Sequence, residues 1–382
     1  MTTPPISAAA QWITDPAVLN ARLTAGAPAR IGLDTEFIRE RTYWPQLALV
    51  QIAIDGDILL VDPLAPGINA ALAPLLADRS VLKVMHSASE DLVALKRACG
   101  VVPQPLFDTQ IAAALAGVGA GVGYQRLVQE TLGVALEKGE TRSDWLRRPL
   151  SASQLDYAAD DVRHLFALHD VLAEKLQSLD RSAWLQEDCA RLVGNAEQDE
   201  LERWPHLSLR AAQYLDGDAQ RRLLRVLRWR DLYARDNDRP RTWILENDFA
   251  TALARDPPID MAALQRQLDA QPKAPKRLGD VIWQALTTPL ADEADAPSPR
   301  SDERDKQALR KMQDAVAARS AELGLPDGVL ASRRWLELLL DNLQKDGRMP
   351  EDGMWPGPLA GWRRAQLEPA LSPSSGTTGD AH

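Results

Sequence analysis

Strand-like apolar runs occur only in the first third of this chain, and that restriction limits its possible folds more than any other feature. Residues 29–37, 47–54 and 58–62 are short apolar runs separated by turn-like segments. The residues between the last two runs, Asp55-Gly56-Asp57, are typical of a tight hairpin turn. The three runs therefore predict an antiparallel meander.

Helices and strands alternate after the meander. Residues 68–76 have a helical pattern, residues 81–86 predict a fourth strand, and a helix is expected from Ser89, where a serine followed by two acids suits a helix N-terminus. A fifth short strand is expected near Leu106. Apolar residues recur at helical spacing over residues 151–179, which predicts one long amphipathic helix. This order of elements predicts an α/β domain with a mixed sheet.

After about residue 200 the strand patterns end and the chain becomes helical in pattern. One acidic, proline-bearing stretch without large apolar residues, ADEADAPSPRSDER, is typical of a solvated linker. We therefore predict an α/β domain over residues 1–200, a first helical domain over 205–290, a linker over 291–304, a second helical domain over 305–371 and a disordered tail over 372–382.

The net charge of −10 argues against binding of nucleic acid through bulk positive charge, so phosphate binding must be local. Arginines crowd residues 221–241, interleaved with leucines and aromatic residues. Acids also intervene there, at Asp231, Asp236 and Asp238. The segment therefore has two interpretations: a surface that grips phosphates, or a salt-bridged solvated face.

No apolar stretch reaches the roughly 18 residues that a membrane-spanning helix needs. The N-terminus lacks a basic segment followed by an apolar core, and the chain has two cysteines, Cys99 and Cys189. These features predict a soluble cytoplasmic protein with inert thiols. The residues indicate no membrane and no protein partner, and a monomer is compatible with them.

Acidic residues fall at the ends of predicted elements in the first domain. Asp34 and Glu36 are two apart on a predicted strand, so both side chains project from one face. Asp91 lies at the start of the helix after the fourth strand. Tyr157 and Asp161 are four apart on the long helix and share one of its faces. Taken singly, each pattern also fits a solvated cap or a surface pair.

Four carboxylates brought together would repel one another unless cations neutralised them. All-oxygen ligation suits Mg²⁺ or Mn²⁺, and two such ions can drive phosphodiester hydrolysis. The hydroxyl of Tyr157 stays protonated at neutral pH and is therefore a poor general base. Its expected task is to orient the attacking water by hydrogen bonding. His86 and His164 lack partners at zinc-ligand spacing and are expected to be structural or surface histidines.

The predicted site residues fall in three segments: Asp34-Thr35-Glu36-Phe37, His86-Ser87-Ala88-Ser89-Glu90-Asp91-Leu92 and Tyr157-Ala158-Ala159-Asp160-Asp161-Val162. Together these segments resemble the three exonuclease motifs of the ribonuclease D family, the tyrosine-bearing branch of the DEDD 3′–5′ exonucleases. The resemblance continues through residues 41–47, 107–110 and 142–150 and covers most of the first 180 residues. It implies a ribonuclease H-like mixed sheet with flanking helices.

By this resemblance, the catalytic residues are Asp34, Glu36, Asp91, Tyr157 and Asp161. The four acids among them are the ligands of two divalent cations, Mg²⁺ or Mn²⁺; Tyr157 positions the water, and Glu36 also lies near the terminal 3′-hydroxyl. Asp160 departs from the family pattern, which has a small residue there. The Tyr-x-x-x-Asp spacing selects Asp161, although Asp160 could reach the same side of the helix.

Residues 223–231, LLRVLRWRD, look like the HRDC module, a helical domain shared by RecQ-type helicases and ribonuclease D, and the second helical domain resembles it more weakly. The resemblance implies a 3′–5′ exoribonuclease that releases nucleoside 5′-monophosphates and trims the 3′ extensions of structured RNA, chiefly tRNA precursors. Two alternatives remain at this point: a DNA exonuclease of repair or proofreading type, and a non-catalytic nucleic-acid-binding protein on the same fold.

Overall fold

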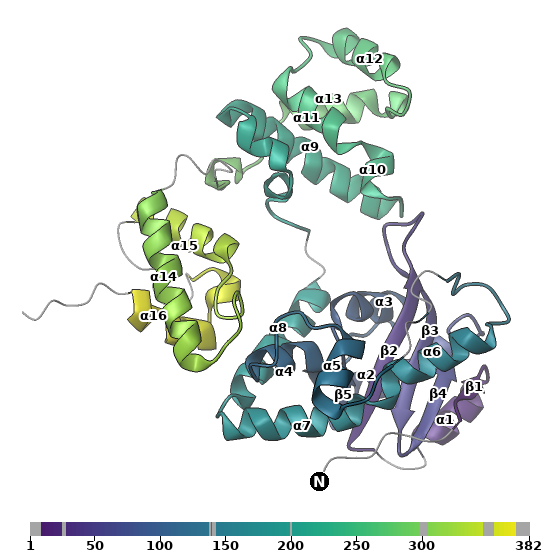
Figure 1. Ribbon diagram of the computed structural model, residues 1–382. Helices are drawn as coiled ribbons and strands as arrows, with labels where there is room; N and C mark the ends of the chain where they lie inside the picture. Colours follow the sequence, from purple (N-terminus) through teal and green to yellow (C-terminus); the bar gives the residue numbers. More distant parts are fainter. Residues whose placement is uncertain are drawn as a thin grey trace, which may run out of the picture.

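A six-stranded mixed sheet forms the centre of the N-terminal half of the computed structural model (Figure 1), with strand order β1-β4-β3-β2-β5-β6. Strands β2, β3 and β4 pair antiparallel, and the β1–β4, β2–β5 and β5–β6 pairs are parallel. The predicted meander and mixed α/β sheet are confirmed, whereas β1 is a strand that we did not predict. The bounds are β1 (Gln11–Ile13), β2 (Arg30–Ile38), β3 (Gln46–Ile54), β4 (Asp57–Val61), β5 (Leu82–Met85) and β6 (Leu106–Asp108).

The structure describes residues 9–24, 28–136, 139, 143–198, 201–297, 305–346 and 355–371. Three predicted segments lie partly or wholly outside these ranges: the tail, 372–382, the second half of the linker, 298–304, and Arg142 of the family-like segment. Among the described helices none is long and apolar enough to cross a membrane.

Helices cover both faces of the sheet. Helix α6 packs across β2, β3 and β4, whereas α3 contacts β2 and β3. Gly32 of β2 lies under α7, where a Cβ atom would approach Leu165 Cδ1 to 3.2 Å, so the side chains of β2 in phase with Gly32 face α6 and α7. The helices are α1 (Pro16–Thr24), α2 (Ile68–Ala77), α3 (Ser89–Cys99), α4 (Thr109–Leu115), α5 (Tyr124–Leu132), α6 (Ala152–Arg163), α7 (Leu165–Ser178) and α8 (Ser182–Gln198).

The single helix predicted over residues 151–179 is wrong, because the structure has two helices that meet at His164. The hydroxyl of Tyr124 donates to the carbonyl of Asp160 at 3.1 Å and accepts from the backbone N–H of His164 at 3.2 Å. A side chain inserted between a carbonyl and the amide four residues later interrupts the helical ladder. Apolar spacing continues across this break, which is why the sequence pattern did not reveal it.

The first helical bundle has an apolar core of its own, formed around α9, which contacts α10, α11 and α13. It meets the α/β domain at the loop between β2 and β3. There Asp238, just after α9, accepts from the backbone N–H groups of Tyr43 and Trp44, both at 3.0 Å. Its α-helices are α9 (Gly217–Asp236), α10 (Arg241–Ile244), α11 (Asn247–Arg255), α12 (Met261–Ala270) and α13 (Gly279–Thr287).

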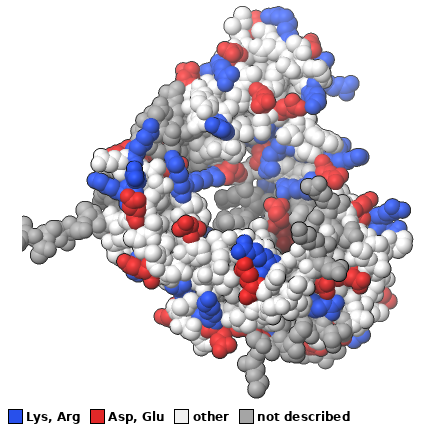
Figure 2. Space-filling model, in the orientation of Figure 1, with Lys and Arg blue, Asp and Glu red and all other residues white. Residues whose placement is uncertain are grey.

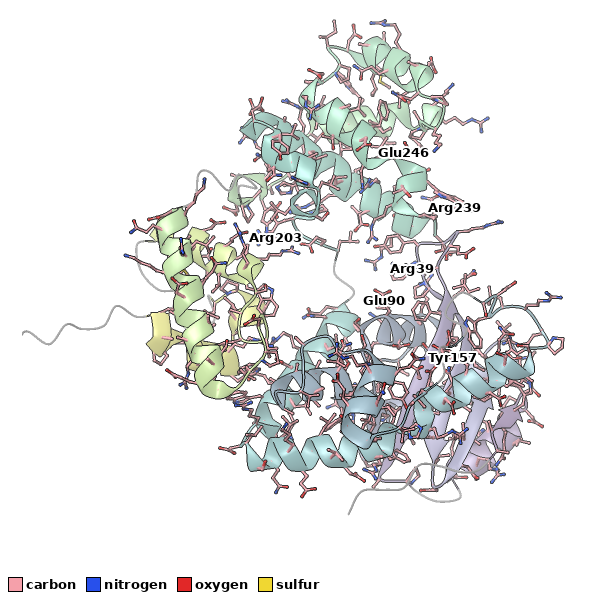
Figure 3. All side chains as sticks on the ribbon, viewed as in Figure 1. Arg39, Glu90, Tyr157, Arg203, Arg239 and Glu246 are labelled. Carbon is pink, nitrogen blue, oxygen red and sulfur yellow. The ribbon has the colours of Figure 1, made fainter. Side chains whose placement is uncertain are left out.

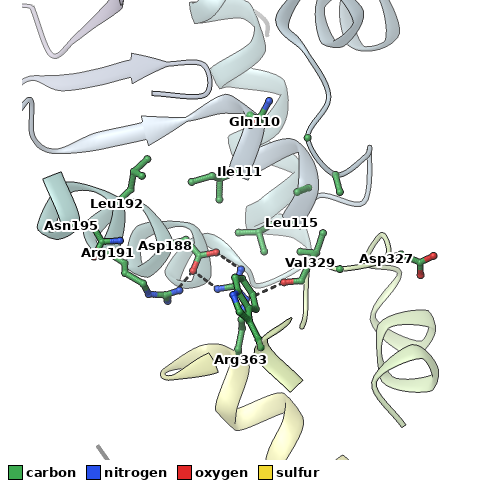
Figure 4. A pocket seen from close by; sticks show the side chains of 15 residues that line it. Gln110, Ile111, Leu115, Asp188, Arg191, Leu192, Asn195, Asp327, Val329 and Arg363 are labelled. Carbon is green, nitrogen blue, oxygen red and sulfur yellow. Dashed lines mark hydrogen bonds and ion pairs between the residues drawn. The ribbon is translucent and has the colours of Figure 1, made fainter. Parts of the chain in front are cut away.

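The second helical bundle shares the apolar core of the α/β domain. Trp362 stacks on Trp184 of α8 at 4.3 Å, and Arg363 forms a two-point ion pair with Asp188 of α8 at 2.6 and 2.9 Å. A cavity of about 520 Å³ opens beside this ion pair (Figure 4). The bundle comprises α14 (Lys306–Leu323), α15 (Arg333–Asp346) and α16 (Trp362–Leu371).

The predicted solvated linker is wrong at its start. Asp292 accepts from Arg228 at 2.7 Å, and Glu293 accepts from Arg225 at 2.6 Å. Glu293 opens a short 3₁₀ turn, η4 (Glu293–Asp295). Acidic residues that face arginines on a neighbouring helix are held in place, although their composition alone resembles a linker.

Candidate active site

The predicted acids gather around the end of β2. Asp34 and Glu36 project from the face of β2 that α6 covers, whereas Thr35 projects from the opposite face. In the antiparallel register with β3, Asp34 pairs with Gln51 and Glu36 pairs with Leu49. The strand alternation inferred from the sequence therefore holds for the first two acids.

Asp91 lies in the first turn of α3, directly after a tight turn at Ser87, whose φ is 57°. The carboxylate of Asp108 fixes this turn by accepting from the backbone N–H of Ser87 at 3.2 Å and of Ala88 at 2.8 Å. The hydroxyl of Thr35 then donates to the carboxylate of Asp91. A residue adjacent to Asp34 thus ties the helix of Asp91 to β2.

Tyr157 and Asp161 lie one turn apart on α6, and the tyrosine hydroxyl donates to the Asp161 carboxylate. The Tyr157 ring (labelled in Figure 3) packs against Trp145 with ring centroids 6.1 Å apart. Gly139 also lies against the ring, where a Cβ atom would come within 1.7 Å of Tyr157 Cδ2. The ring is therefore closely packed by Trp145 and Gly139.

Asp160 turns away from the other acids. Its side chain is 42% exposed and pairs with Arg163 at 2.7 Å on the outer side of α6. The charge of this side chain raises the pKa of Asp161. This placement favours Asp161, as the spacing to Tyr157 predicts.

The carboxyl groups of the four predicted ligands hold protons unusually tightly. Burial first, and then the charges of Asp91, Asp161 and Glu36, raise the pKa of Asp34 well above its ordinary value. Burial and the charges of Asp161 and Asp91 raise the pKa of Glu36 to about 8. Burial is also the main cause that raises the pKa of Asp91 to about 7 and the pKa of Asp161 to about 7.

Hydrogen bonds act against these shifts at two of the acids. The Thr35 hydroxyl lowers the pKa of Asp91, and the Tyr157 hydroxyl lowers the pKa of Asp161. Burial and the three nearby acids raise the pKa of Tyr157 itself, so its hydroxyl remains protonated at neutral pH and acts as a hydrogen-bond donor.

The donor set suits a hard divalent cation. The predicted ligands are carboxylates alone, and a cation would remove the repulsion that raises their pKa values. In the described ranges no three His, Cys, Asp or Glu side chains already converge closely enough to hold a metal ion. The acids are nevertheless near enough to raise one another's pKa values.

Four contributions to the site went unnoticed in the sequence. Thr35 and Asp108 hold Asp91 in place, Gly139 borders Tyr157, and Gln51 lies beside Asp34. Thr35 and Asp108 lie within the family-like segments, which was the available signal. Gln51 and Gly139 depend on strand register and on a loop path that no local pattern reveals.

Each of the two histidines has one ring nitrogen, His86 Nε2 and His164 Nδ1, that is buried without a hydrogen-bond partner among the described residues. His86 bonds the Thr109 hydroxyl at 2.8 Å through Nδ1, and His164 lies buried at the break between α6 and α7. Near the acids, the guanidinium of Arg39 pairs with Glu90, the residue before Asp91, at 2.8 Å (Figure 3).

The arginine-rich segment is largely salt-bridged. Arg225 and Arg228 pair with the acids after α13, Arg241 pairs with Asp231, and Arg230 is buried against the carbonyl of Leu245. Figure 2 shows small groups of basic and acidic side chains interspersed on the visible face. These contacts favour a salt-bridged face over a continuous phosphate-gripping surface for these arginines.

Comparisons with known proteins agree with this geometry. A family model described as 3′–5′ exonuclease matches residues 10–177. The chain is 61% identical to ribonuclease D of Xanthomonas oryzae pv. oryzae, covering 95% of this chain and 97% of that protein. It is 37% identical to ribonuclease D of Pseudomonas paraeruginosa, covering 94% and 96%.

A solved structure extends the likeness to the whole molecule. The crystal structure of Escherichia coli RNase D, described as an exoribonuclease involved in structured RNA processing, superposes with a TM-score of 0.79 at 29% identity. The match covers 95% of this chain and 98% of that chain. The similarity therefore includes both helical bundles as well as the α/β domain.

Proposed function

The chain belongs to the ribonuclease D family and is a 3′–5′ exoribonuclease, and on that premise we propose that Asp34, Glu36, Asp91 and Asp161 bind two divalent cations, Mg²⁺ or Mn²⁺. The observation that carries this proposal is the group of four carboxyls, Asp91 buried and the other three half-buried, whose pKa values are raised by loss of solvent and by mutual repulsion. Such a group stabilises a bound cation because the cation replaces protons and removes the repulsion.

The chain's own residues divide the work of phosphodiester hydrolysis. When bound, divalent cations supply Lewis-acid activation of water and stabilise charge on the phosphate oxygens. Tyr157, which stays protonated, orients the attacking water through its hydroxyl. Asp161 holds that hydroxyl, and Thr35 holds Asp91. We propose that Glu36, half-buried near the end of β2, also contacts the terminal 3′-hydroxyl of the RNA.

We further propose that the substrates are structured RNAs with free 3′ extensions, chiefly tRNA precursors, and that nucleoside 5′-monophosphates are released. The support is the similarity, over nearly the whole chain, to a protein described as acting in structured RNA processing. We propose that the two helical bundles are HRDC-like modules, and that the protein acts in the cytoplasm.

The test is a time course with 5′-labelled single-stranded RNA beside its DNA counterpart, with Mg²⁺, with Mn²⁺ and with chelator. Stepwise shortening of RNA from its 3′ end, abolished by chelator, is expected. Asp34→Asn should lose hydrolysis while RNA binding persists, and Tyr157→Phe should bind cation yet hydrolyse more slowly. Faster shortening of DNA would contradict the RNA assignment, and unchanged cleavage by Asp34→Asn would remove Asp34 from the mechanism.

A further inference from the structure

The amide of Gln51 lies fully buried in the central strand β3. Neither its nitrogen nor its oxygen has a hydrogen-bond partner among the described residues. A buried amide without partners costs free energy, so such groups call for an explanation in the surroundings of the side chain.

The strand register identifies the group beside this amide. Residues that pair directly across antiparallel strands project from the same face, with Cβ atoms about 4.5–5.5 Å apart. Gln51 pairs with Asp34 on one side and with Leu60 on the other. Leu60 offers no polar atom, so Asp34 is the directly paired neighbour able to hydrogen-bond the amide.

The carboxyl of Asp34 is an acceptor that suits the amide of Gln51. This half-buried carboxyl lies near three other acids and accepts a hydrogen bond from the backbone at Thr35. Asp91 and Asp161 each have a side-chain hydroxyl donor in addition, from Thr35 and Tyr157. An ionised carboxylate only accepts hydrogen bonds, and an amide nitrogen has two protons to donate.

We propose that Gln51 is a positioning residue: its amide nitrogen donates to the Asp34 carboxylate when divalent cations occupy the site and fixes the orientation in which Asp34 meets them. The assignment rests on the proposed function, because it requires Asp34 to be a ligand of the cations. Hydrogen bonds to a ligating carboxylate are a general means of tuning a metal site.

The test is Gln51→Met, which keeps the length of the side chain and removes both amide atoms. Titration calorimetry with Mg²⁺ alone should show an affinity reduced roughly 10- to 100-fold, the usual effect of removing a group that orients a metal ligand. Thermal unfolding in chelator should occur at the same or a higher temperature, because an unpartnered buried amide has been removed. Gln51→Leu repeats the test if the methionine variant does not fold.

Asn69→Leu is the matched control. The amide oxygen of Asn69 is also buried without a partner among the described residues. Asn69, however, lies on α2, which packs against α1 and α3 and carries none of the four predicted ligands. Mg²⁺ affinity should be unchanged in this variant. An affinity of Gln51→Met within twofold of wild type would overturn the proposal, as would a loss of affinity accompanied by a lower unfolding temperature in chelator. RNA shortening is measured in parallel to separate two failures. If the proposed function is wrong, the wild-type chain does not shorten RNA. If only the role of Gln51 is wrong, the wild-type chain shortens RNA and Gln51→Met binds Mg²⁺ as tightly as wild type.

Discussion

At the residue scale, burial and repulsion act on the same four carboxyls and make the fold sensitive to pH. The pKa values of Glu36, Asp91 and Asp161 lie at about 7 to 8 in the folded chain. The unfolded chain releases these protons near pH 4, the ordinary range for Asp and Glu, so the folded chain binds more protons at any pH in between. The contribution of these groups to stability is therefore greatest below about pH 4 and is lost as the pH rises to about 8.

We expect the unfolding temperature in chelator to decrease from about pH 5 to about pH 8.5. Mg²⁺ should reduce or reverse this decrease, because cations favour the ionised carboxylates. Calorimetric scans across this range test it, with Glu36→Gln as the variant that should flatten the dependence. A temperature that rises with pH in chelator would contradict the pKa values.

The sequence indicated the acids but not what holds them. Asp34 and Glu36 followed from strand alternation, and Tyr157 and Asp161 from helical spacing, because these periods are local properties of the chain. The grouping of Asp91 with them came from the family-like motif. Gln51 reaches Asp34 only through the pairing of β2 with β3, which is a long-range property that the residue pattern does not carry.

At the element scale, the break between α6 and α7 is the feature that places Asp161. Tyr124, from α5, takes the place of the direct bond between the Asp160 carbonyl and the His164 amide. The break comes directly after the turn that carries Asp161, so the inserted hydroxyl sets where α6 ends. The helical pattern over residues 151–179 was predicted, and the interruption was not, because it depends on a side chain about forty residues earlier in the chain.

Tyr124→Phe removes this hydroxyl and leaves two buried backbone groups without their partner. We expect a loss of about 1–3 kcal/mol in the free energy of unfolding, the usual penalty for unsatisfied buried polar groups. Mg²⁺ affinity should also fall, because the end of α6 is free to move.

Denaturant unfolding measures this effect, and Tyr214→Phe is the control because Tyr214 is 69% exposed. The control should change stability by less than about 0.5 kcal/mol. Equal, small effects in the two variants would mean that the helix break does not depend on the hydroxyl.

At the scale of the whole molecule, the two helical bundles are attached in different ways. The first has its own core and meets the loop after β2 through Asp238, so it is linked to the strand that carries Asp34 and Glu36. The second shares the core of the α/β domain. The sequence predicted both as helical regions but not this difference, because it arises from contacts between segments more than a hundred residues apart.

Removal of the second bundle by truncation would expose the apolar surface of α8, so a loss of RNA binding could not be distinguished from a loss of folding. A single substitution tests the attachment of the bundle without removing it. Arg363 and Asp188 are 8% and 7% exposed, and the arginine also donates to the Val329 carbonyl at 3.0 Å. Removing one partner of a buried ion pair costs about 3–5 kcal/mol, because the other charge remains buried.

Arg363→Met should therefore destabilise the chain strongly, although Trp362 and Arg191 still contact the Asp188 carboxylate and will hold the loss near the lower end, about 3 kcal/mol. Arg333→Met, which breaks a pair with Glu337 on an exposed side of α15, is the control and should change stability by under about 1 kcal/mol. Because the shared core joins α8 to the second bundle, the α/β domain and that bundle should lose stability together in denaturant. The measurements are Mg²⁺ affinity and tryptophan fluorescence, to which the stacked Trp184 and Trp362 contribute among eleven tryptophans. Loss of the tryptophan signal at a denaturant concentration where Mg²⁺ binding is retained would show instead that the second bundle is an independent module.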